Sequence, residues 1–523
     1  MSTLFNGILD GDVDAVVRAL RGGEPAEAVA DGETALYRAA VADEAAIVRV
    51  LLAAGADPAR GSGAEGGDLP LCGAACGGHA EVVRALLAAG AHPDQEEVYG
   101  FTAMAWAVRL GHAETVRVLL EHGADPDRPG PDGLPPLVAA ARRGSTPSVR
   151  ALLEHGAGGL EDALREARRW IGVDIAGAVL RGLLETHGSE PYEAVVRRVR
   201  EDGGITVVVD LLREDGAPGS GNEQQTGHAA IATLLETALG VRTPCEELAA
   251  RALRCGDPDL DDWTEAVAAL ASRADEETFH AAAAWCAGDT ILRRSLGASV
   301  LGGLDTFGSR SLPLLRRLAT ETLSTPGASG VGAAGSPASG PVAGLGAAGS
   351  PASRPGGGEG GREPALAVVA ALGRVGDAAG LPELLAFAGH ADAEVRRAVG
   401  TALTGLVPAG HARAVDTLLA LSRDHDSGVR DWATLALAEV PEDTPVLREA
   451  LAARLDDPDP DVVAEAARGL AMRQDPRATE ALAALLADAT PDGTARDTAL
   501  AALEFVRDER VRRRLEWTTP RCR

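Results

Sequence analysis

The chain has 523 residues, enough for several domains, and its 50 Lys and Arg against 77 Asp and Glu give a formal net charge of −27. None of the basic residues is a lysine, which excludes Schiff-base, P-loop and kinase lysines and is typical of a GC-rich bacterial genome. The acidic balance opposes general binding to nucleic acid or to an anionic membrane, unless a local basic stripe overrides it.

The sequence shows no sign of a membrane-spanning or exported segment. No apolar stretch reaches about 18 residues without a charge, and the first residues carry Asp10, Asp12 and Asp14 where a signal peptide has a positive region. The six cysteines are scattered, as expected for reduced thiols. We therefore expect a cytoplasmic protein without a membrane anchor.

A heptapeptide recurs through the first third of the chain. It reads LLAAGAD at residues 51–57, LLAAGAH at 86–92, LLEHGAD at 119–125 and LLEHGAG at 152–158, with steps of 35, 33 and 33 residues. A fixed period near 33 residues indicates one helical unit copied in tandem, in which each copy buries its apolar face against a neighbour.

The residues before each heptapeptide define the unit. Thr-Ala-Leu or Thr-Ala-Met precedes an Ala-rich inner helix at residues 34–36 and 102–104, and Gly-His opens an outer helix at Gly78-His79. This unit resembles the ankyrin repeat, with a turn, a short inner helix, and an outer helix that ends in Leu-Leu and a glycine cap. The resemblance covers residues 4–159, with a degenerate first unit at 4–25, and implies a stack of helix hairpins.

The repeat signature disappears from residue 160, although helical periodicity continues at residues 160–170, 174–186 and 191–201. The β-branched run at 205–212 would also suit a strand. We predict a helix there, because the following Arg, Glu, Asp and Gly continue it as a helical C-terminus. Residues 216–226 are predicted as a polar turn or linker.

A second repeated pattern follows, in which an aspartate begins an apolar helical segment. The last four of its six copies are spaced 34, 33 and 33 residues apart, and an arginine follows four residues later in most copies. The pattern resembles HEAT repeats of the short bacterial type, which also occur in bilin-lyase-like proteins, and it covers residues 228–515. The aspartates are Asp259, Asp289, Asp392, Asp426, Asp459 and Asp492, and the arginines are Arg293, Arg396, Arg430 and Arg496.

The Asp and Arg of this pattern have a structural interpretation. An aspartate at a helix N-terminus caps free backbone N–H groups and suits the helix dipole. An arginine one turn later can reach the aspartate of the adjacent repeat, and for Arg430 we expect the partner to be Asp392. These Asp and Arg residues would then form a ladder of ion pairs along the stack. The alternative is that they form a row of ligand-binding residues.

Residues 325–363 interrupt the second pattern with a Gly, Ala, Ser and Pro tract. The sequence GAAGSPAS occurs twice within it, at residues 332–339 and 346–353. Such a composition buries too little apolar surface to offset chain entropy, so we predict a disordered insertion.

No pattern in the sequence favours catalysis or a metal site. Cys72, Cys76, His79 and His92 lack the close Cys pairs of zinc sites, and each has a place in the repeat. GxSxG, Walker A and HExxH motifs are absent, and no Rossmann fingerprint follows a strand. We expect no catalytic residue, no cofactor and no metal.

One turn of the ankyrin-like region carries side chains that a turn does not need. Aromatic and arginine residues dominate the energetics of interfaces, and such residues fall here at the exposed ends of two consecutive units. We predict a partner-binding surface, and packing of the aromatics on neighbouring turns is the alternative. The surface comprises Val98, Tyr99, Phe101, Arg109, Leu110, Asp132, Leu134, Arg142 and Arg143.

These observations predict an all-α fold, an α-solenoid in which an ankyrin stack precedes a HEAT stack. The domains are ankyrin repeats at residues 1–159, a helical connector at 160–226 and HEAT-like repeats at 227–523. We expect a non-catalytic scaffold or adaptor that binds a protein or peptide in its concave surface and acts as a monomer. The sequence does not identify the partner.

Two alternatives belong to other functional classes. An enzyme accessory or lyase-like protein would need polar side chains that converge on the concave HEAT surface. A nucleic-acid-binding HEAT protein would need an arginine-lined concave face, to which Arg293, Arg294, Arg316, Arg317, Arg396 and Arg397 could contribute.

Overall fold

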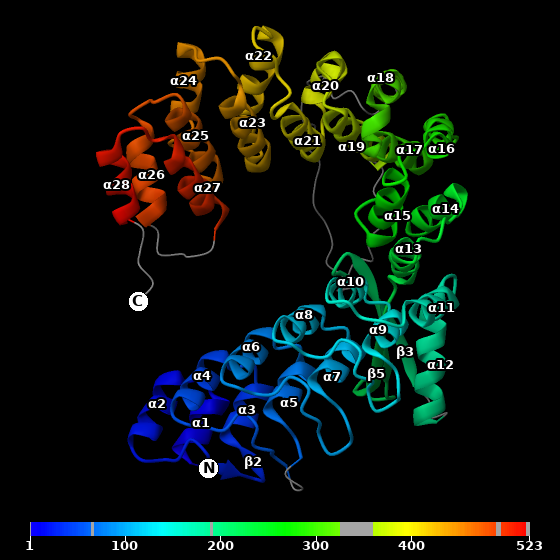
Figure 1. Ribbon diagram of the computed structural model, residues 1–523, viewed down its shortest axis with the longest axis vertical. Coiled ribbons are helices and arrows are strands. Elements are labelled where there is room, and N and C mark those ends of the chain that lie inside the picture. The colour runs from blue at the N-terminus through cyan, green and yellow to red at the C-terminus, as the bar shows by residue number, and fades with distance from the viewer. Residues whose placement is uncertain (1, 64–66, 189–191, 325–358, 488–492, 519–523) are drawn as a thin grey trace, which may run out of the picture. The chain divides into compact units, whose positions relative to one another are not determined.

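The computed structural model describes residues 2–63, 67–188, 192–324, 359–487 and 493–518. The chain divides into two compact units, residues 1–269 and 270–523. Each unit is built from pairs of antiparallel helices, so the α-solenoid class predicted from the sequence holds for both (Figure 1).

The first unit begins with five helix pairs that stack in two rows. The inner helices of each pair pack on one another in sequence, and so do the outer helices (Figure 1). The inner row is α1 (Thr3–Leu9), α3 (Ala35–Val41), α5 (Pro70–Gly77), α7 (Ala103–Leu110) and α9 (Pro136–Arg143). The outer row is α2 (Val13–Arg21), α4 (Ala45–Ala53), α6 (Ala80–Ala88), α8 (Ala113–Glu121) and α10 (Thr146–Glu154). Strands β1 (Val29–Ala30) and β2 (Glu33–Thr34) form a short hairpin before α3.

The repeated sequence explains this stack. The first leucine of each heptapeptide is fully buried between the rows, and burial of a leucine is worth about 1.5–3 kcal/mol. These four residues are Leu51, Leu86, Leu119 and Leu152. Thr34 and Thr102 cap the inner helices that follow them. The Thr34 hydroxyl accepts a hydrogen bond from the N–H of Tyr37, and the Thr102 hydroxyl accepts one from the N–H of Ala105.

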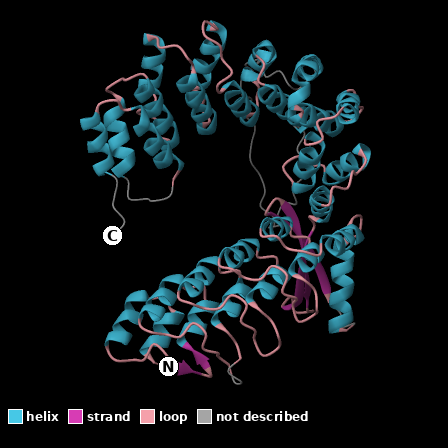
Figure 2. Ribbon diagram, in the orientation of Figure 1, coloured by secondary structure: helices cyan, strands magenta, loops and turns pink. Residues whose placement is uncertain are grey.

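Residues 160–226 differ from the helical connector that the sequence predicted. Helices α11 (Leu160–Trp170) and α12 (Ile175–His187) form as expected. Strands β3 (Glu193–Glu201), β4 (Gly204–Leu212) and β5 (Pro218–Gln225) then form an antiparallel sheet in the order β3-β4-β5 (Figure 2). The helices predicted at residues 191–201 and 205–212, and the linker at 216–226, were therefore wrong.

Two local features explain the sheet. Asp202 and Gly203 have φ angles of 50° and 74°, the positive values of a two-residue hairpin turn. Val207, Val209 and Leu211 alternate along β4 and bury one face of it against α12. Val208 and Leu212 on the other face are also apolar, and only Asp210 between them marks the period of two in the sequence.

Three further helices complete the first unit, of which the last runs into the second. They are α13 (His228–Ala238), α14 (Cys245–Cys255) and α15 (Asp261–Ala271). Helix α11 packs on α9, and α13 packs on α11, so the row of inner helices continues past the last ankyrin-like pair.

The second unit is also a two-row stack. One row is α17 (Ile291–Gly303), α19 (Glu359–Val375), α21 (Ala393–Leu403), α23 (Ser427–Glu439), α25 (Pro460–Met472) and α27 (Thr494–Ala502), each packed on the next. The other is α16 (Glu276–Cys286), α18 (Gly308–Ser324), α20 (Leu381–Ala386), α22 (Ala412–Leu421), α24 (Pro445–Ala452), α26 (Ala478–Ala487) and α28 (Glu509–Thr518). Short 3-10 turns lie at Asp305–Phe307, Ala378–Gly380, Phe387–Gly389 and Leu503–Phe505.

The insertion predicted at residues 325–363 falls mostly outside the described residues, which resume at 359. Residues 359–363 belong to the first turns of α19, so the predicted insertion extends too far at its C-terminal end. Throughout the described residues, every helix is too short or too polar to cross a membrane.

Candidate functional site

The turn before α7 presents two of the predicted site residues to solvent. Val98 is 56% exposed and Tyr99 is 79% exposed, values that stand out for apolar or aromatic side chains. Nothing in the turn requires them, since the N–H of Gly100 donates to Glu97 O and the N–H of Glu97 to Phe101 O. These two side chains are therefore available for contact with another molecule.

Phe101, at the end of the same turn, packs within its own repeat. Its ring stacks on Trp106 with a centroid distance of 4.2 Å and an interplanar angle of 16°. Trp106 Nε1 donates to Glu97 Oε2 at 3.0 Å, and the N–H of Leu69 donates to Glu97 Oε1 at 3.2 Å. Burial raises the pKa of Glu97, although these two hydrogen bonds lower it. Phe101 thus packs within its own repeat and not on a neighbouring turn, whereas Tyr99 is exposed.

A cavity of about 390 Å³ lies beside this turn in the groove of the first unit. Its walls come from α7, α9, the turn between them and strand β5. Seven of the nine predicted site residues line it, whereas Val98 and Tyr99 do not. The seven are Phe101, Arg109, Leu110, Asp132, Leu134, Arg142 and Arg143.

Strand β5 forms the end wall of the cavity, which sequence reasoning missed because it assigned these residues to a linker. Asn222, Glu223 and Gln224 line the cavity. Gln224 Nε2 donates to the carbonyl oxygens of Arg142 and Arg143, at 2.8 and 2.5 Å. The Asp-Gly pair at 202–203, which marks a tight hairpin, was the available signal.

Arg143 is bound inside the chain and not exposed to a partner. Only 8% of its side chain is exposed. Its guanidinium donates to the backbone oxygen of Glu223, to Glu223 Oε1 at 2.5 Å and to Leu110 O at 3.0 Å. We therefore correct the prediction that Arg143 contacts a partner, because it fastens β5 to α9.

The other arginines around the cavity differ in whether a carboxylate pairs with them. Arg128 Nη2 lies 2.6 Å from Glu96 Oε1, and Arg142 Nε lies 2.9 Å from Glu166 Oε1. The Arg109 guanidinium lies over the Phe101 ring at 5.9 Å. Among the described residues, Arg109 is the one arginine of the cavity without a carboxylate partner.

The Cys and His residues weighed as metal ligands have roles in the stack. His79 Nε2 donates to Val41 O at 3.2 Å, and burial raises the pKa of the Cys72 thiol well above its usual range. Within the described ranges, no three His, Cys, Asp or Glu side chains are grouped as metal ligands.

The Asp and Arg ladder of the second unit is present, with a different partner from the one predicted. Arg396 bonds both carboxylate oxygens of Asp424, at 2.8 and 2.9 Å. Arg430 does the same with Asp457, at 2.9 Å for each bond, so the expected partner Asp392 was wrong. The partner lies two residues before the capping aspartate of the following repeat.

Capping and pairing thus use different aspartates. Asp426 Oδ1 caps α23 by accepting from the N–H of Val429, while Asp424 receives Arg396. Burial raises the pKa of Asp424, but its hydrogen bonds from Arg396 outweigh this and hold the pKa below its usual value. The same balance lowers the pKa of Asp457.

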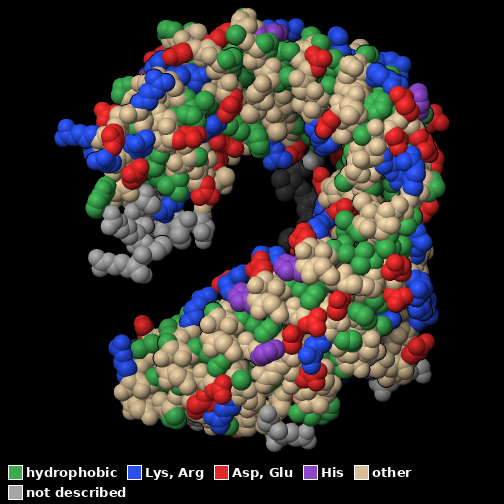
Figure 3. Space-filling view, in the orientation of Figure 1, with side chains coloured by type: hydrophobic (Ala, Val, Ile, Leu, Met, Phe, Trp, Pro, Cys, Tyr) green, Lys and Arg blue, Asp and Glu red, His purple; other side chains and the backbone are tan. Residues whose placement is uncertain are grey.

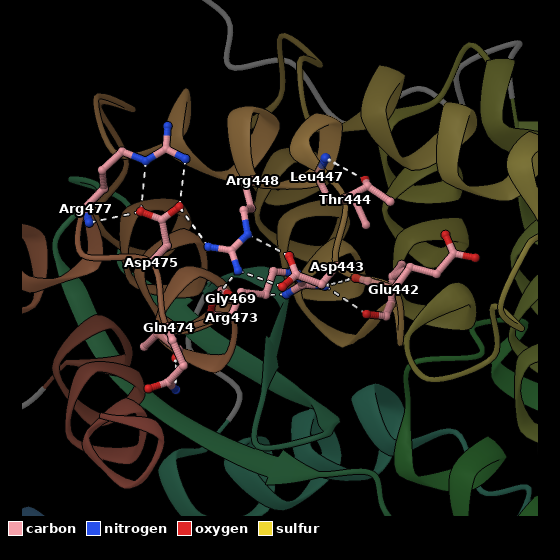
Figure 4. Close-up of polar contacts among 12 residues, drawn as sticks. Glu442, Asp443, Thr444, Leu447, Arg448, Gly469, Arg473, Gln474, Asp475 and Arg477 are labelled. Atoms are coloured by element: carbon pink, nitrogen blue, oxygen red, sulfur yellow. Dashed lines mark hydrogen bonds and ion pairs between the residues drawn. The ribbon is translucent and has the colours of Figure 1, made fainter. Parts of the chain in front are cut away.

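A second polar cluster ties α24 to the end of α25 (Figure 4). Arg448 Nε donates to Asp443 Oδ1 at 2.7 Å, and its Nη1 lies 3.3 Å from Asp475 Oδ2. Arg477 bonds both oxygens of Asp475, and with burial opposing it this holds the pKa of Asp475 well below its usual range. Arg473 donates to several backbone carbonyls, Val440 O among them at 2.8 Å. The cluster joins repeats and leaves no carboxylate free for acid or base chemistry.

Several arginines proposed for nucleic-acid contact are also engaged in ion pairs. Arg396 is bound to Asp424, Arg316 lies 2.8 Å from Glu383, and Arg397 pairs with Glu394. Acidic and basic side chains are interspersed over the face shown in Figure 3.

Comparison with known families agrees with the geometry of both units. A model of the ankyrin repeat matches residues 31–61, and a model of three ankyrin repeats matches residues 61–130. A model of HEAT repeats matches residues 362–438. The protein joins ankyrin repeats to HEAT repeats. Both kinds of repeat generally serve as scaffolds for protein interactions. No curated protein matches the chain.

Proposed function

We propose that this ankyrin–HEAT protein is a non-catalytic scaffold whose ankyrin groove binds a segment of another protein. The cavity carries this proposal, because it gathers six residues chosen from sequence for their interface chemistry, besides Arg143, which is bound inside the chain. The exposed Val98 and Tyr99 stand on the same turn as Phe101, which lines the cavity, and extend the apolar surface toward solvent.

The HEAT unit supports the scaffold proposal because its arginines hold neighbouring repeats together. Its stacking arginines are bonded to carboxylates of neighbouring repeats, so they act in the architecture. We infer that this unit extends the scaffold and that the protein acts as a cytoplasmic monomer. Cys72, Cys76, Cys255 and Cys286 are free thiols, in keeping with a reducing compartment.

The proposal is tested by placing a photo-reactive amino acid at position 99 of the full chain and, as a control, at exposed position 9 on α1. A partner of the groove should cross-link at 99 and not at 9. With that partner purified, Tyr99→Ser should weaken binding about tenfold, the loss of a side chain at the energetic centre of an interface, without changing thermal unfolding. Equal cross-linking at both positions, or unchanged binding of the Ser variant, would contradict the proposal.

A further inference from the structure

The cavity contains a guanidinium that is held in place but not neutralised. Phe101 stacks on Trp106 with a centroid distance of 4.2 Å, and the Arg109 guanidinium lies over the Phe101 ring at 5.9 Å from its centroid. A planar guanidinium on an aromatic face keeps its N–H edge free for a bidentate acceptor. Arg109 is therefore oriented by the stack and open to a ligand.

The other arginines of the cavity are already bound. Arg128 pairs with Glu96, Arg142 with Glu166 and Arg143 with Glu223. The opposing charge is Asp132, whose Oδ1 accepts from the N–H of Leu134 at 3.2 Å. Arg109 thus favours a negatively charged group in the cavity, whereas Asp132 disfavours one.

The remaining lining suits the apolar part of a peptide. Leu110, Pro131 and Leu134 line the cavity alongside Phe101. Strand β5 closes the groove where it is bonded to the end of α9 by Gln224 and Arg143. An extended ligand that enters from the earlier repeats therefore ends at this wall, with its last side chains in the cavity.

We propose that the cavity binds an acidic side chain of a partner peptide, with the carboxylate paired to Arg109 and a neighbouring apolar residue against Leu110 and Leu134. This inference rests on the proposed function of the groove and adds the chemical class of its ligand. A carboxylate is the acceptor whose two oxygens match a guanidinium edge. The charge of the ligand is thus opposite to that of the only uncompensated cation described in the cavity.

The experiment selects random dodecapeptides, displayed on phage, against the full-length chain. The selected peptides are synthesised in matched forms with Glu, Gln or Lys at the enriched acidic position. Their affinities are measured for wild type and for four variants, Arg109→Gln, Asp132→Asn, Tyr99→Ser and Arg165→Gln. Arg165 is the matched control, since its side chain is 76% exposed on α11 and does not line the cavity.

We expect the selected peptides to carry Asp or Glu beside an apolar residue. Replacing Glu by Gln, or Arg109 by Gln, should weaken binding by roughly 10- to 100-fold, as loss of a charge-assisted hydrogen bond predicts. Asp132→Asn should strengthen binding, because it removes a like charge, and Arg165→Gln should leave it unchanged. Circular dichroism of each variant establishes that the repeats still fold.

The outcomes separate this inference from the function it rests on. Peptides that bind without an acidic residue, lose affinity with Tyr99→Ser and ignore Arg109→Gln would overturn the acidic ligand while retaining the groove as a binding site. Peptides that bind all of these variants like wild type would overturn both.

Discussion

The first unit, here called the ankyrin unit, and the second, the HEAT unit, join neighbouring repeats by different chemistry. In the ankyrin unit, imidazoles bond backbone carbonyls of the preceding repeat, as His79 does to Val41 O and His112 to Cys76 O, at 3.2 and 3.0 Å. In the HEAT unit, Arg396 and Arg430 form bidentate ion pairs across repeats. The ankyrin unit therefore stacks through imidazoles and through arginines such as Arg128 and Arg143, but not through Arg109, whereas the HEAT rungs at Arg396 and Arg430 are arginine–carboxylate pairs.

The difference shows why the two units differ in their capacity for recognition. A guanidinium that already bonds a buried carboxylate has few donors left for a ligand. Arg109 lies in the unit that stacks through imidazoles, and it is the arginine without a carboxylate in its cavity among the described residues. Arg109 thus differs both from Arg128 and Arg143 of its own cavity, which bond the preceding repeat, and from the ladder arginines of the HEAT unit.

The largest expected effect comes from breaking a rung of the HEAT ladder. Arg430→Ala leaves Asp457, whose side chain is 3% exposed, with a contact to Arg454 at 3.3 Å and a hydrogen bond from the N–H of Asp459 at 3.2 Å. Removing one partner of a buried ion pair costs about 3 kcal/mol. The free energy of local unfolding should fall by this amount in α23 and α25, measured by hydrogen exchange in increasing urea.

A double-mutant cycle sharpens this test. Asp457→Asn should couple to Arg430→Ala, whereas Asp392→Asn should be additive with it. Arg413→Ala, at an exposed position on α22, is the control and should have little effect. Additivity of Arg430 and Asp457 would show that this contact does not join the repeats.

The next effect is a pH response specific to the first unit, at α13 where it packs beside the last ankyrin-like pair. Burial lowers the pKa of His228 to about 4, so in the folded state its ring stays neutral where an unfolded histidine is protonated. The unfolded state binds more protons between pH 6.5 and 4, and stability from this group is lost as pH falls through that range. Between pH 7 and 5 the loss should be about 2 kcal/mol.

This response is measured as a difference between wild type and His228→Gln, because Asp261 opposes it. Burial raises the pKa of Asp261 to about 6, so its protonation adds stability as pH falls below 6. Urea unfolding at pH 7 and 5, read by hydrogen exchange in α9 and α13, should show the variant to be less sensitive to pH. His280→Gln, at a histidine that is 70% exposed, should retain the wild-type response.

The HEAT ladder should respond at lower pH. The pKa values of Asp424 and Asp457 are below their usual values, so their stabilisation is complete above the unfolded pKa of about 4. It is lost as pH falls from there toward the folded pKa values. If the stability contributed by these ion pairs were lost already between pH 6.5 and 5, the contrast with the His228 response would be contradicted.

The smallest effect is expected from an imidazole of the ankyrin stack. His112→Ala removes one hydrogen bond to Cys76 O and should cost about 1 kcal/mol, a third of the effect at Arg430. His155 bonds Ala151 O within its own helix, so His155→Ala is a matched control that leaves the contact between repeats intact. Equal losses for Arg430→Ala and His112→Ala in local unfolding would remove the distinction between the two units.

Prediction from sequence succeeded where one residue position repeats the same environment. Leu51, Leu86, Leu119 and Leu152 share a period and a buried place, so the ankyrin stack follows from their spacing. The same logic identifies Asp392, Asp426 and Asp459 as N-caps of HEAT helices. It was wrong for Asp289, because Thr290 caps α17, and Asp492 lies outside the described residues. A repeated sequence pattern indicates the local structure of each unit, because every copy packs against equivalent neighbours.

Prediction failed where a contact joins parts of the chain that do not repeat. Strand β5 follows α9 by about eighty residues, and the bond between Arg143 and Glu223 has no counterpart in another repeat. The partner of Arg430 was misassigned for a related reason, since the sequence shows the period of the aspartates but not the direction in which the arginine extends. The seven residues around the cavity were found because they follow the ankyrin pattern.

The way in which β5 is seated on α9 also limits how the array can lengthen. Gly144, at φ 78°, ends α9 where a Cβ would collide with the Gln225 carbonyl oxygen, and the N–H of Gly227 donates to Gly144 O at 3.1 Å. A repeat duplicated after residue 159 would separate α9 from this fitted surface, whereas one duplicated before residue 126 would leave it whole. Gene duplication, or an engineer adding consensus repeats, can therefore extend the ankyrin stack of this protein only on the N-terminal side of α9.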